Sequence, residues 1–207
     1  MTRAENRART RRRLLDAAAL RIVEKGFAAT SVEDIVAQAG YTRGAFYSNF
    51  SNKHDLFVEL LRADHQDLRE AVQALLCSAP PGKDLHMPLA LLVERYYHDD
   101  GNYIIWAEAR LLAMRDASFR QHLNVLYVER RELIARFIER CCGRLGMQFS
   151  RSYAGHALAS IALLDGIHYF RMTIPEALPN EPAGKILNNV LMRMLVAEWM
   201  LDMPGHR

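Results

Sequence analysis

The stretch that decides the fold is residues 30–56, which read TSVEDIVAQAGYTRGAFYSNFSNKHDL. The apolar residues Val32, Ile35 and Val36 recur at the spacing of one helix face and predict a helix over 31–39. A glycine follows this helix directly, and a second, shorter helical pattern begins after it. Two short helices joined by a turn of about three to four residues that contains glycine are typical of a helix-turn-helix.

Capping residues mark the ends of both helices. Thr30 followed by Glu33 is interpreted as a capping box that opens the first helix. Gly40 ends this helix, and Thr42 can cap the second helix, which we expect to run to about Asn49. The capping residues therefore favour the same boundaries as the apolar spacing does.

The second helix is expected to have one buried face and one outward face. Phe46 and Phe50 lie four residues apart and should anchor the helix in a small core. The outward face consists of Arg43, Gly44, Tyr47, Ser48 and Asn49. Gly44 costs roughly 1 kcal/mol relative to alanine inside a helix, and close approach of the backbone to a ligand would offset that cost.

This outward face has the chemistry of a DNA-binding surface. A major groove admits a helix and offers hydrogen-bond acceptors to Arg43. The hydroxyls of Thr42, Tyr47 and Ser48 suit phosphate oxygens. Lys53 follows in the first turn of the next helix, whose N-terminal amides also attract a phosphate. A merely solvated polar surface is the alternative for each residue taken alone, and it is disfavoured for the set.

Positive charge is concentrated in the first quarter of the chain. The net charge of the 207 residues is +3, but residues 1–53 contain ten basic and five acidic residues, and the remainder has an excess of acid. This asymmetry suggests a basic head that meets a polyanion and a near-neutral body. The first residues are rich in arginine, namely Arg3, Arg7, Arg9, Arg11, Arg12 and Arg13. They form either an arm that reaches a phosphate backbone or minor groove, or a solubilising tail; the sequence leaves both open.

The rest of the chain also follows helical patterns. A first helix is expected from about Arg3 to Lys25, and Gly26 closes it. A connecting helix of about residues 52–76 follows the helix-turn-helix. Later helices are expected at about 85–99, 102–115, 117–145, 151–172 and 183–202. The sequence therefore predicts an all-α protein of about nine helices.

The last two expected helices, at about 151–172 and 183–202, are apolar on more than one face. A helix that is apolar nearly all round must be buried nearly all round. A second copy of the chain is the simplest cover for the face that one chain leaves open, so these helices predict a homodimer. The alternative is a monomeric bundle in which both helices are central.

The sequence lacks the patterns of several other protein classes. Its three cysteines, Cys77, Cys141 and Cys142, give no disulfide framework and no metal-binding spacing, which favours a reducing, cytoplasmic setting. No apolar run is long enough to span a bilayer. No nucleophile elbow, P-loop, dinucleotide-binding glycine motif or HExxH spacing occurs. We therefore expect no membrane association, no metal, no cofactor and no enzymatic activity.

Residues of about 11–61 resemble the N-terminal domain of the TetR family of transcriptional regulators. The resemblance rests on the combination of Gly26-Phe27, Thr30, Ile35-Val36, Ala39-Gly40, Thr42, Gly44, Phe46-Tyr47, Phe50 and Lys53. The family often has Ser where Thr42 stands, Leu or Ile where Phe46 stands, and His where Asn49 stands. The last of these departures could alter base preference.

The resemblance implies a helix-turn-helix DNA-binding domain over residues 1–50 and an effector-binding and dimerisation domain over 51–207, connected by the helix of about 52–76. It implies a dimer in which the last two helices of each chain form a four-helix bundle. It also implies phosphate contacts at Thr30, Thr42, Tyr47 and Lys53, and a base-facing set of Tyr41, Arg43, Gly44 and Ser48.

The function implied is that of a ligand-responsive repressor. A dimer would bind a palindromic operator on double-stranded DNA, and a small-molecule effector in the body would move the connecting helix and change the spacing of the two heads. The alternative is a DNA-bound interaction protein that recruits a protein partner and senses no small molecule.

Aromatic, methionine and polar residues of the body are candidates for an effector pocket. The candidates are Tyr97, Trp106, Arg110, Met114, Tyr127, Asp165, His168 and Tyr169, with Tyr103 and Met172 of the same kind. Trp106, Arg110 and Met114 share one helix face, and Asp165 and His168 share another. Because a buried carboxylate needs a partner, we expect a medium-sized, mostly apolar effector with one polar or cationic group. For most of these residues an ordinary place in the core is the alternative.

Overall fold

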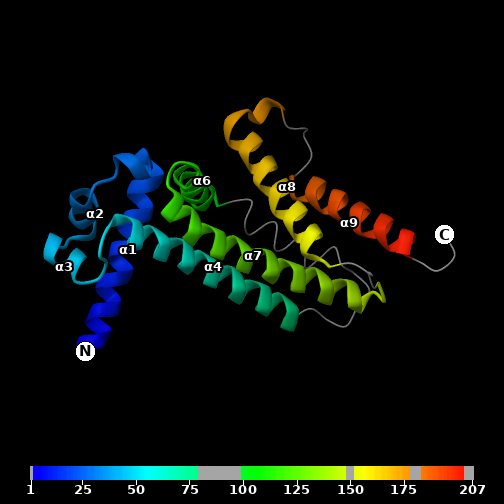
Figure 1. Cartoon of the computed structure of the whole chain (residues 1–207), viewed down its shortest axis with the longest axis horizontal. Helices are drawn as coiled ribbons and strands as arrows, with labels where there is room; N and C mark the ends of the chain where they lie inside the picture. Colours follow the sequence, from blue (N-terminus) through cyan, green and yellow to red (C-terminus); the bar gives the residue numbers. More distant parts are fainter. Residues whose placement is uncertain (1, 79–98, 148–151, 178–182, 203–207) are drawn as a thin grey trace. The chain divides into compact units, whose positions relative to one another are not determined.

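The computed structural model describes residues 2–78, 99–147, 152–177 and 183–202 (Figure 1). The elements are α1 (Arg3–Ala29), α2 (Val32–Ala39), α3 (Arg43–Tyr47), α4 (Lys53–Ser78), α6 (Asp100–Arg115), α7 (Ala117–Arg144), α8 (Ala154–Thr173), the 3-10 helix η1 (Pro175–Ala177) and α9 (Ala183–Asp202). Every regular element in the described residues is helical, so the predicted all-α class is confirmed. The helix expected at 85–99 falls outside these residues except for its last position. None of the described helices is both long and apolar enough to cross a bilayer.

The chain divides into two compact units. The first unit contains Met1–Gln66 and Gly101–Leu126, and the second contains Asp67–Asp100 and Tyr127–Arg207. Helices α1, α2, α3 and nearly all of α6 belong to the first unit, whereas α8 and α9 belong to the second. Helix α6 therefore groups with the helix-turn-helix, while the domain boundary expected at residue 50 stays a prediction.

Apolar side chains of α1, α2 and α3 form the core of the first unit. Leu14, Ala18 and Ile22 lie one turn apart along α1 and are buried. They share this core with Ile35 of α2 and Phe46 of α3, which are both fully buried. Burying a side chain of the size of Leu, Ile or Phe contributes about 1.5–3 kcal/mol, so these contacts fix the three helices together.

Helix α1 is interrupted at Gly26, where the sequence predicts its end. The φ of Gly26 is +82°, a conformation that side chains with a Cβ adopt only with strain. The N–H of Phe27 donates a hydrogen bond of 2.9 Å to a carboxylate oxygen of Glu108 on α6. A Cβ at residue 26 would lie 3.2 Å from the same carboxylate. The glycine therefore serves both the backbone turn and the close approach of α6.

The capping box of α2 is shifted by one residue from the expected position. Ser31 is the N-cap, and its Oγ accepts a hydrogen bond of 3.1 Å from the Asp34 N–H. The Asp34 carboxylate in turn accepts one of 2.7 Å from the Ser31 N–H. The prediction that Thr30 and Glu33 form the box is wrong because the Thr30 hydroxyl donates to the Gly26 carbonyl instead, at 2.8 Å.

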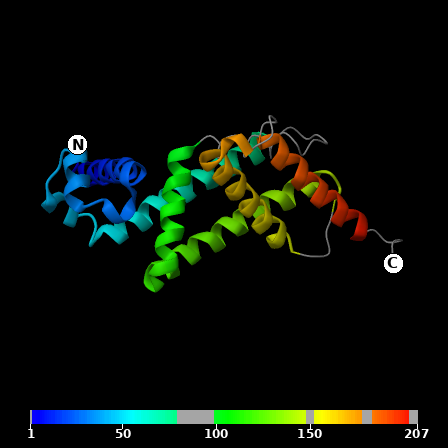
Figure 2. The ribbon, with the colours of Figure 1, turned by 90° about the horizontal axis from the view of Figure 1, so that it is seen from above.

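Buried side chains from α4, α7, α8 and α9 form the core of the second unit. The cluster includes Leu68, Val72, Phe137, Ile138, Cys142, Ala157, Leu191 and Leu195. Burial raises the pKa of the Cys142 thiol to about 12, so this side chain acts as a small apolar group. Helices α8 and α9 pack against each other (Figure 2). The helices predicted at 102–115, 117–145, 151–172 and 183–202 are therefore present as α6 to α9, with ends that differ by a few residues at most.

Candidate nucleic-acid interface

The turn between α2 and α3 has the geometry of a helix-turn-helix. Helix α2 ends at Gly40, which adopts the left-handed conformation with a φ of +72°. The Tyr41 N–H donates to the Val36 carbonyl at 2.9 Å and closes the end of α2. Thr42 is the N-cap of α3, and its Oγ1 accepts a hydrogen bond of 3.4 Å from the Ala45 N–H. The predicted end of α2 and start of α3 are confirmed.

Two phenylalanines hold α3 against the rest of the first unit. Phe46 is fully buried and Phe50 nearly so, and their ring centroids lie 5.7 Å apart. Helical geometry stops at Tyr47 rather than at the predicted Asn49, so α3 is shorter than expected. With both rings turned inward, the opposite side of α3 faces outward, as the spacing predicts.

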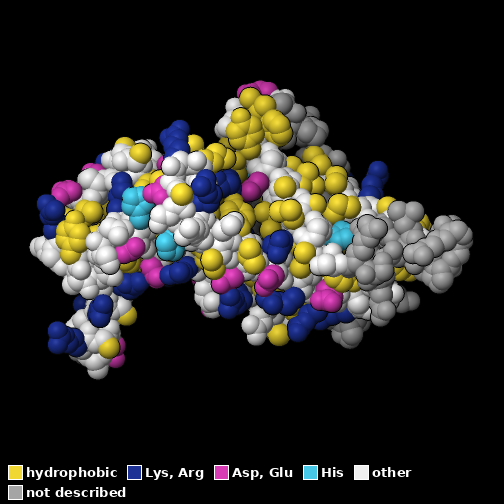
Figure 3. All heavy atoms as spheres, viewed as in Figure 1, with side chains coloured by type: hydrophobic (Ala, Val, Ile, Leu, Met, Phe, Trp, Pro, Cys, Tyr) yellow, Lys and Arg dark blue, Asp and Glu magenta, His cyan; other side chains and the backbone are white. Residues whose placement is uncertain are grey.

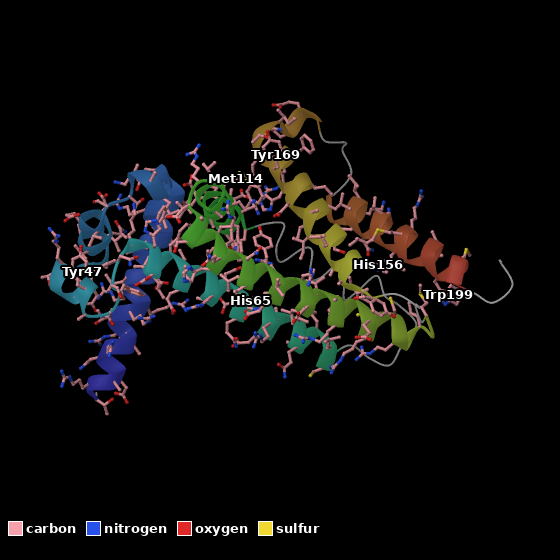
Figure 4. The ribbon with its side chains drawn as sticks, viewed as in Figure 1. Tyr47, His65, Met114, His156, Tyr169 and Trp199 are labelled. Atoms are coloured by element: carbon pink, nitrogen blue, oxygen red, sulfur yellow. The ribbon has the colours of Figure 1, made fainter. Side chains whose placement is uncertain are left out.

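Arg43 and Tyr47 form the exposed edge of α3. The side chain of Arg43 is 64% exposed, and Tyr47, labelled in Figure 4, is 50% exposed. Arg43 Nη1 lies 3.1 Å from a carboxylate oxygen of Glu33, and its guanidinium carbon lies 5.9 Å from the centroid of the Tyr47 ring. A hydrogen bond with Tyr47 and the negative charge of Glu33 raise the pKa of Arg43 above its ordinary value. The guanidinium is thus oriented by its neighbours and still accessible to an external acceptor.

Nothing within the described part of the chain requires a glycine at residue 44. The φ of Gly44 is not positive. A Cβ there would meet only the Thr42 Oγ1, at an ordinary contact distance of 3.7 Å. Because glycine destabilises a helix by about 1 kcal/mol relative to alanine, this residue carries a cost that the fold of the chain does not offset. It leaves the outward side of α3 open to close approach by a partner.

Three further residues expected at the interface have polar or aromatic groups engaged within the chain. Ser48 Oγ donates to the Ala45 carbonyl at 2.9 Å, and Asn49 Nδ2 donates to the same carbonyl at 2.8 Å. The Tyr41 ring lies under Arg13, with 5.4 Å between its centroid and the guanidinium carbon. These contacts close the end of α3 and tie the turn to α1.

Thr30 and Lys53, both expected to contact phosphates, close the end of α1 in the structure. Thr30 is 1% exposed, and its hydroxyl donates to the Gly26 carbonyl. Lys53 Nζ donates to the carbonyls of Phe27 at 2.8 Å and Thr30 at 2.7 Å, and it lies 4.3 Å from the centroid of the Phe27 ring. Burial lowers the pKa of Lys53. A phosphate contact by either residue stays a prediction.

The arginine-rich start of the chain is helical rather than an extended arm. Helix α1 begins at Arg3, and Lys and Arg side chains gather along its first turns (Figure 3). Arg7 Nη2 donates to the Ser48 carbonyl at 3.4 Å, and Arg11 Nη1 donates to the Asn49 carbonyl at 2.8 Å. Sequence reasoning missed this role, in which two arginines one turn apart bind the carbonyl end of α3.

Arg11 also joins α3 to α4. Its Nη2 lies 2.9 Å from a carboxylate oxygen of Glu59, and its guanidinium carbon lies 4.4 Å from the centroid of the Phe50 ring. Burial alone would raise the pKa of Glu59, but hydrogen bonds from Arg11 and Arg62 hold it below its ordinary value. Arg11 is therefore a positioning residue for α3, and its spacing of four from Arg7 is the signal that the sequence offered.

Residues 14–60, which include the whole helix-turn-helix, match the family described as bacterial regulatory proteins, tetR family. Residues 14–60 therefore form a helix-turn-helix of the TetR family, a family of DNA-binding transcription regulators rather than of enzymes.

Two curated proteins illustrate the similarity of this chain to known regulators. It is 39% identical over 67 residues to the uncharacterized HTH-type transcriptional regulator YdgC of Bacillus subtilis (strain 168), covering 32% of this chain and 34% of YdgC. It is 36% identical over 87 residues to the HTH-type transcriptional repressor KstR2 of Rhodococcus jostii (strain RHA1), covering 42% of this chain and 41% of KstR2. The chain thus aligns with less than half the length of either relative.

A fold shared with a solved transcriptional regulator extends over most of the chain. The crystal structure of the transcriptional regulator FadR from Bacillus subtilis in complex with stearoyl-CoA is similar with a TM-score of 0.72. The two sequences are 18% identical, and the match covers 90% of this chain and 97% of FadR. This likeness shows the shared fold.

The effector residues expected on α6 lie in different environments. Trp106 is buried, and its Nε1 donates to a carboxylate oxygen of Asp64 at 2.8 Å. Arg110 packs over Tyr103, with 5.5 Å between its guanidinium carbon and the ring centroid. Met114, labelled in Figure 4, is 74% exposed. The spacing of four does not bring these side chains to one place, because each step of four residues turns the helix face by about 40°.

The effector residues expected on α8 differ in burial as well. His168 is buried, with its Nε2 3.2 Å from an Asp100 carboxylate oxygen and 2.9 Å from Arg171 Nη2. Arg171 also pairs with Asp100. Asp165 is half-buried, and Tyr169 is exposed beside the end of the helix (Figure 4). His168 is thus engaged in contacts between α8 and the start of α6.

Two expected effector residues remain. Tyr127 is half-buried on α7, and Tyr97 lies outside the described residues. Within the described ranges, no cluster of His, Cys, Asp and Glu could hold a metal ion. An effector role stays a prediction for all eight residues.

Proposed function

We propose that this chain is a ligand-responsive transcriptional repressor that binds a palindromic operator as a homodimer and is released by a small-molecule effector. The observation that carries the DNA-binding part is the exposed edge of α3, where Arg43 and Tyr47 flank a glycine that the fold does not require. A helix that exposes a cationic and hydroxyl-bearing edge, with its phenylalanine side chain buried on the opposite side, fits a major groove.

Each residue of this edge has a role in the proposed interface. Arg43 would exchange its contact with Glu33 for acceptors on a guanine edge, where a bidentate arginine contact discriminates between bases. The hydroxyls of Tyr47 and Thr42 would donate hydrogen bonds to phosphate oxygens. Such contacts fix the position of α3 on the duplex without distinguishing between DNA sequences. Gly44 would allow the backbone of α3 to lie close to the DNA.

The homodimer is supported by the outward faces of α8 and α9. Leu158 of α8 is 56% exposed and Val190 of α9 is 43% exposed, so each helix has an outward apolar side chain that a second copy of the chain would cover. A two-fold symmetric dimer presents two copies of α3 to successive major grooves about 34–36 Å apart and therefore reads a palindrome. The operator predicted by this arrangement has two inverted half-sites.

Repression and effector release are supported by relatives. KstR2 is named a transcriptional repressor, and the FadR structure contains stearoyl-CoA. In our proposal, a medium-sized, mostly apolar effector with one polar or cationic group binds the body. It releases DNA by favouring a head spacing other than the one that fits the operator, since a ligand shifts an equilibrium only by its differential affinity for the two forms.

Selection from a random duplex library tests the DNA-binding part of the proposal. The full chain should enrich inverted repeats, and the Arg43→Ala variant should enrich a more degenerate motif. Enrichment of direct repeats, or of no motif, would overturn the operator assignment.

Thermal-shift screening then tests the effector part. Apolar compounds with one cationic group should stabilise the chain and release the selected duplex, whereas a response confined to small acids, or none, would contradict this part and favour recruitment of a protein partner.

A further inference from the structure

The amide that follows the break in α1 takes its acceptor from α6. Gly26 has a φ of 82° and a ψ of 159°, which lie outside the helical region, so the next N–H no longer points along the helix axis. Phe27 is 4% exposed, and a buried N–H without an acceptor destabilises a fold. Glu108 supplies this acceptor at 2.9 Å, although it lies 81 residues further along the chain (Figure 1).

The other groups of Phe27 are held by the start of α4. Its ring stacks on Phe57, with 4.5 Å between the centroids, and the ring of His54 approaches it edge-on at 5.2 Å. Lys53 Nζ donates to the Phe27 carbonyl at 2.8 Å and lies 4.3 Å from the centroid of the same ring. One residue at the end of α1 thus contacts both α4 and α6.

The start of α7 belongs to the same cluster. Phe119 stacks on Phe57, with 5.5 Å between the centroids. Asp116, between α6 and α7, accepts a hydrogen bond of 2.9 Å from the Phe119 N–H, and its carboxylate lies 4.0 Å from His54 Nε2. All of these residues lie in the first unit. The end of α1 is therefore packed between the start of α4 and the corner that joins α6 to α7.

The same cluster leads directly into the helix-turn-helix. The Thr30 hydroxyl donates to the Gly26 carbonyl at 2.8 Å, and the Thr30 carbonyl accepts a hydrogen bond of 2.7 Å from Lys53 Nζ. Ser31 then caps α2. Because α2 begins immediately after these contacts, a displacement of Phe27 displaces α2 and, through the turn, α3.

We propose that Glu108 is a positioning residue for DNA binding, whose carboxylate holds Phe27 and thereby sets the orientation of α2 and α3 relative to α4 and α6. The inference rests on the proposed function, in which a dimer places two copies of α3 in successive major grooves. With Glu108 in place, α3 has one orientation and the dimer accepts one half-site spacing. Without this acceptor, α3 samples several orientations, and the apparent affinity falls by the fraction that fits the operator.

The close approach of α6 makes the reach of the side chain at residue 108 decisive. A Cβ at residue 26 would lie 3.2 Å and 3.4 Å from the two carboxylate oxygens of Glu108, so both oxygens lie against the backbone at the break. Glutamine at residue 108 would keep an oxygen acceptor of the same reach without the charge. Aspartate would keep the charge and withdraw its oxygens by one methylene. The two variants therefore separate reach from charge.

Operator duplexes of altered spacing test the proposal. One or two base pairs are added or removed between the half-sites of the selected operator, and the affinity of the full chain for each duplex is measured by fluorescence anisotropy. The wild type should bind the altered duplexes much more weakly, since each base pair rotates one half-site by about 35° relative to the other. Glu108→Ala should bind the original operator about 10-fold more weakly, as expected if the fitting orientation is populated about one-tenth of the time. Its affinity should also depend less on spacing.

The conservative variants show whether the acceptor is responsible. Glu108→Gln should restore both the affinity and the spacing dependence of the wild type, whereas Glu108→Asp should behave as Glu108→Ala does. Restoration by aspartate and not by glutamine would assign the effect to charge and overturn the acceptor role. Unchanged affinity and spacing dependence in Glu108→Ala would overturn the proposal outright.

Two further measurements separate orientation from stability. Val72→Ala in the core of the second unit should lower stability and keep the spacing dependence of the wild type. If Glu108→Ala likewise binds more weakly with an unchanged spacing dependence, Glu108 only stabilises the fold. Hydrogen exchange of the free wild type should show a protected Phe27 amide, and exchange at the rate of an unprotected amide would refute the contact without any variant. A wild type that binds no duplex would refute the proposed function instead.

Discussion

The helix-turn-helix and the last two helices differ in where their apolar residues lie. In α3, Phe46 is buried and the outward residues Arg43 and Tyr47 are polar. In α8 and α9, apolar residues are buried on one side and exposed on the other, as Leu158 and Val190 show. The comparison teaches that the outward face of a helix indicates its partner. A cationic, hydroxyl-bearing face with a glycine suits a polyanion, and an apolar face suits another protein surface.

The largest effect on stability is expected from a substitution in the buried core of the helix-turn-helix. Phe46→Ala should lower the free energy of unfolding by about 3–5 kcal/mol, because it removes a fully buried aromatic ring. Urea denaturation followed by circular dichroism measures this loss. Tyr47→Ala is the matched control, and it should cost much less because half of that side chain is already exposed. Similar losses for the two variants would show that α3 is not anchored as described.

Removing the cation from the outward face should have the next largest effect. Arg43→Ala should weaken binding to the selected operator by about 1–3 kcal/mol and relax the preference at one base pair of each half-site. Tyr47→Phe should weaken binding to all duplexes alike, since it removes a hydroxyl assigned to phosphate. Fluorescence anisotropy over single-base operator variants distinguishes the two. Arg136→Ala on α7 serves as the control and should change neither affinity nor preference. The reverse ranking, with Tyr47→Phe changing preference, would overturn the assignments.

The glycine of α3 allows stability and binding to be separated. Gly44→Ala should raise the free energy of unfolding by up to about 1 kcal/mol, because a Cβ at this position meets no clash within the chain. The same variant should bind the operator more weakly, because the methyl group occupies space needed by the DNA. Gly143→Ala on α7, where a Cβ would also meet nothing, should leave operator affinity unchanged. Unimpaired binding by Gly44→Ala would mean that the DNA does not approach this side of α3.

The smallest effect is expected at the capping box of α2. Asp34 lies 2.7 Å from Lys25 Nζ, and hydrogen bonds from Lys25 and Ser31 lower the pKa of Asp34. A carboxyl group whose pKa is depressed on folding adds stability above its unfolded pKa of about 4, and this stability is lost as the pH falls through the folded pKa. Asp34→Asn should therefore be less stable than the wild type at pH 7, with a difference that shrinks below about pH 4. Denaturation curves with a constant difference across this range would contradict the described pairing.

The sequence predicts helical periodicity and the turn well, because both depend on near neighbours. The spacing of Val32, Ile35 and Val36, the end of the helix at Gly40 and the cap at Thr42 are all local features, and each is confirmed. The outward face of α3 follows from the same spacing.

Contacts between distant parts of the chain could not be predicted from these patterns. The Thr30 hydroxyl donates to the Gly26 carbonyl near the end of α1. Ser31 rather than Thr30 therefore caps α2. Lys53 donates to the carbonyls of Phe27 and Thr30 at the same end of α1, and more than twenty residues of chain separate it from each of them. Arg11 contacts α3 and α4 at once. In each case a residue type suited to phosphate also suits a carbonyl or carboxylate of the chain itself, and only the tertiary structure decides between them.

The salt dependence of operator binding by the wild-type chain tests the outward role of α3 most directly. Each phosphate neutralised by a Lys or Arg side chain contributes a slope of about −0.9 to a plot of log affinity against log salt concentration. We expect affinity for the selected duplex to fall linearly on this plot with a slope equal to several such contacts. An affinity that does not change with salt, or no measurable affinity for any duplex, would contradict a DNA-binding edge at Arg43 and Tyr47.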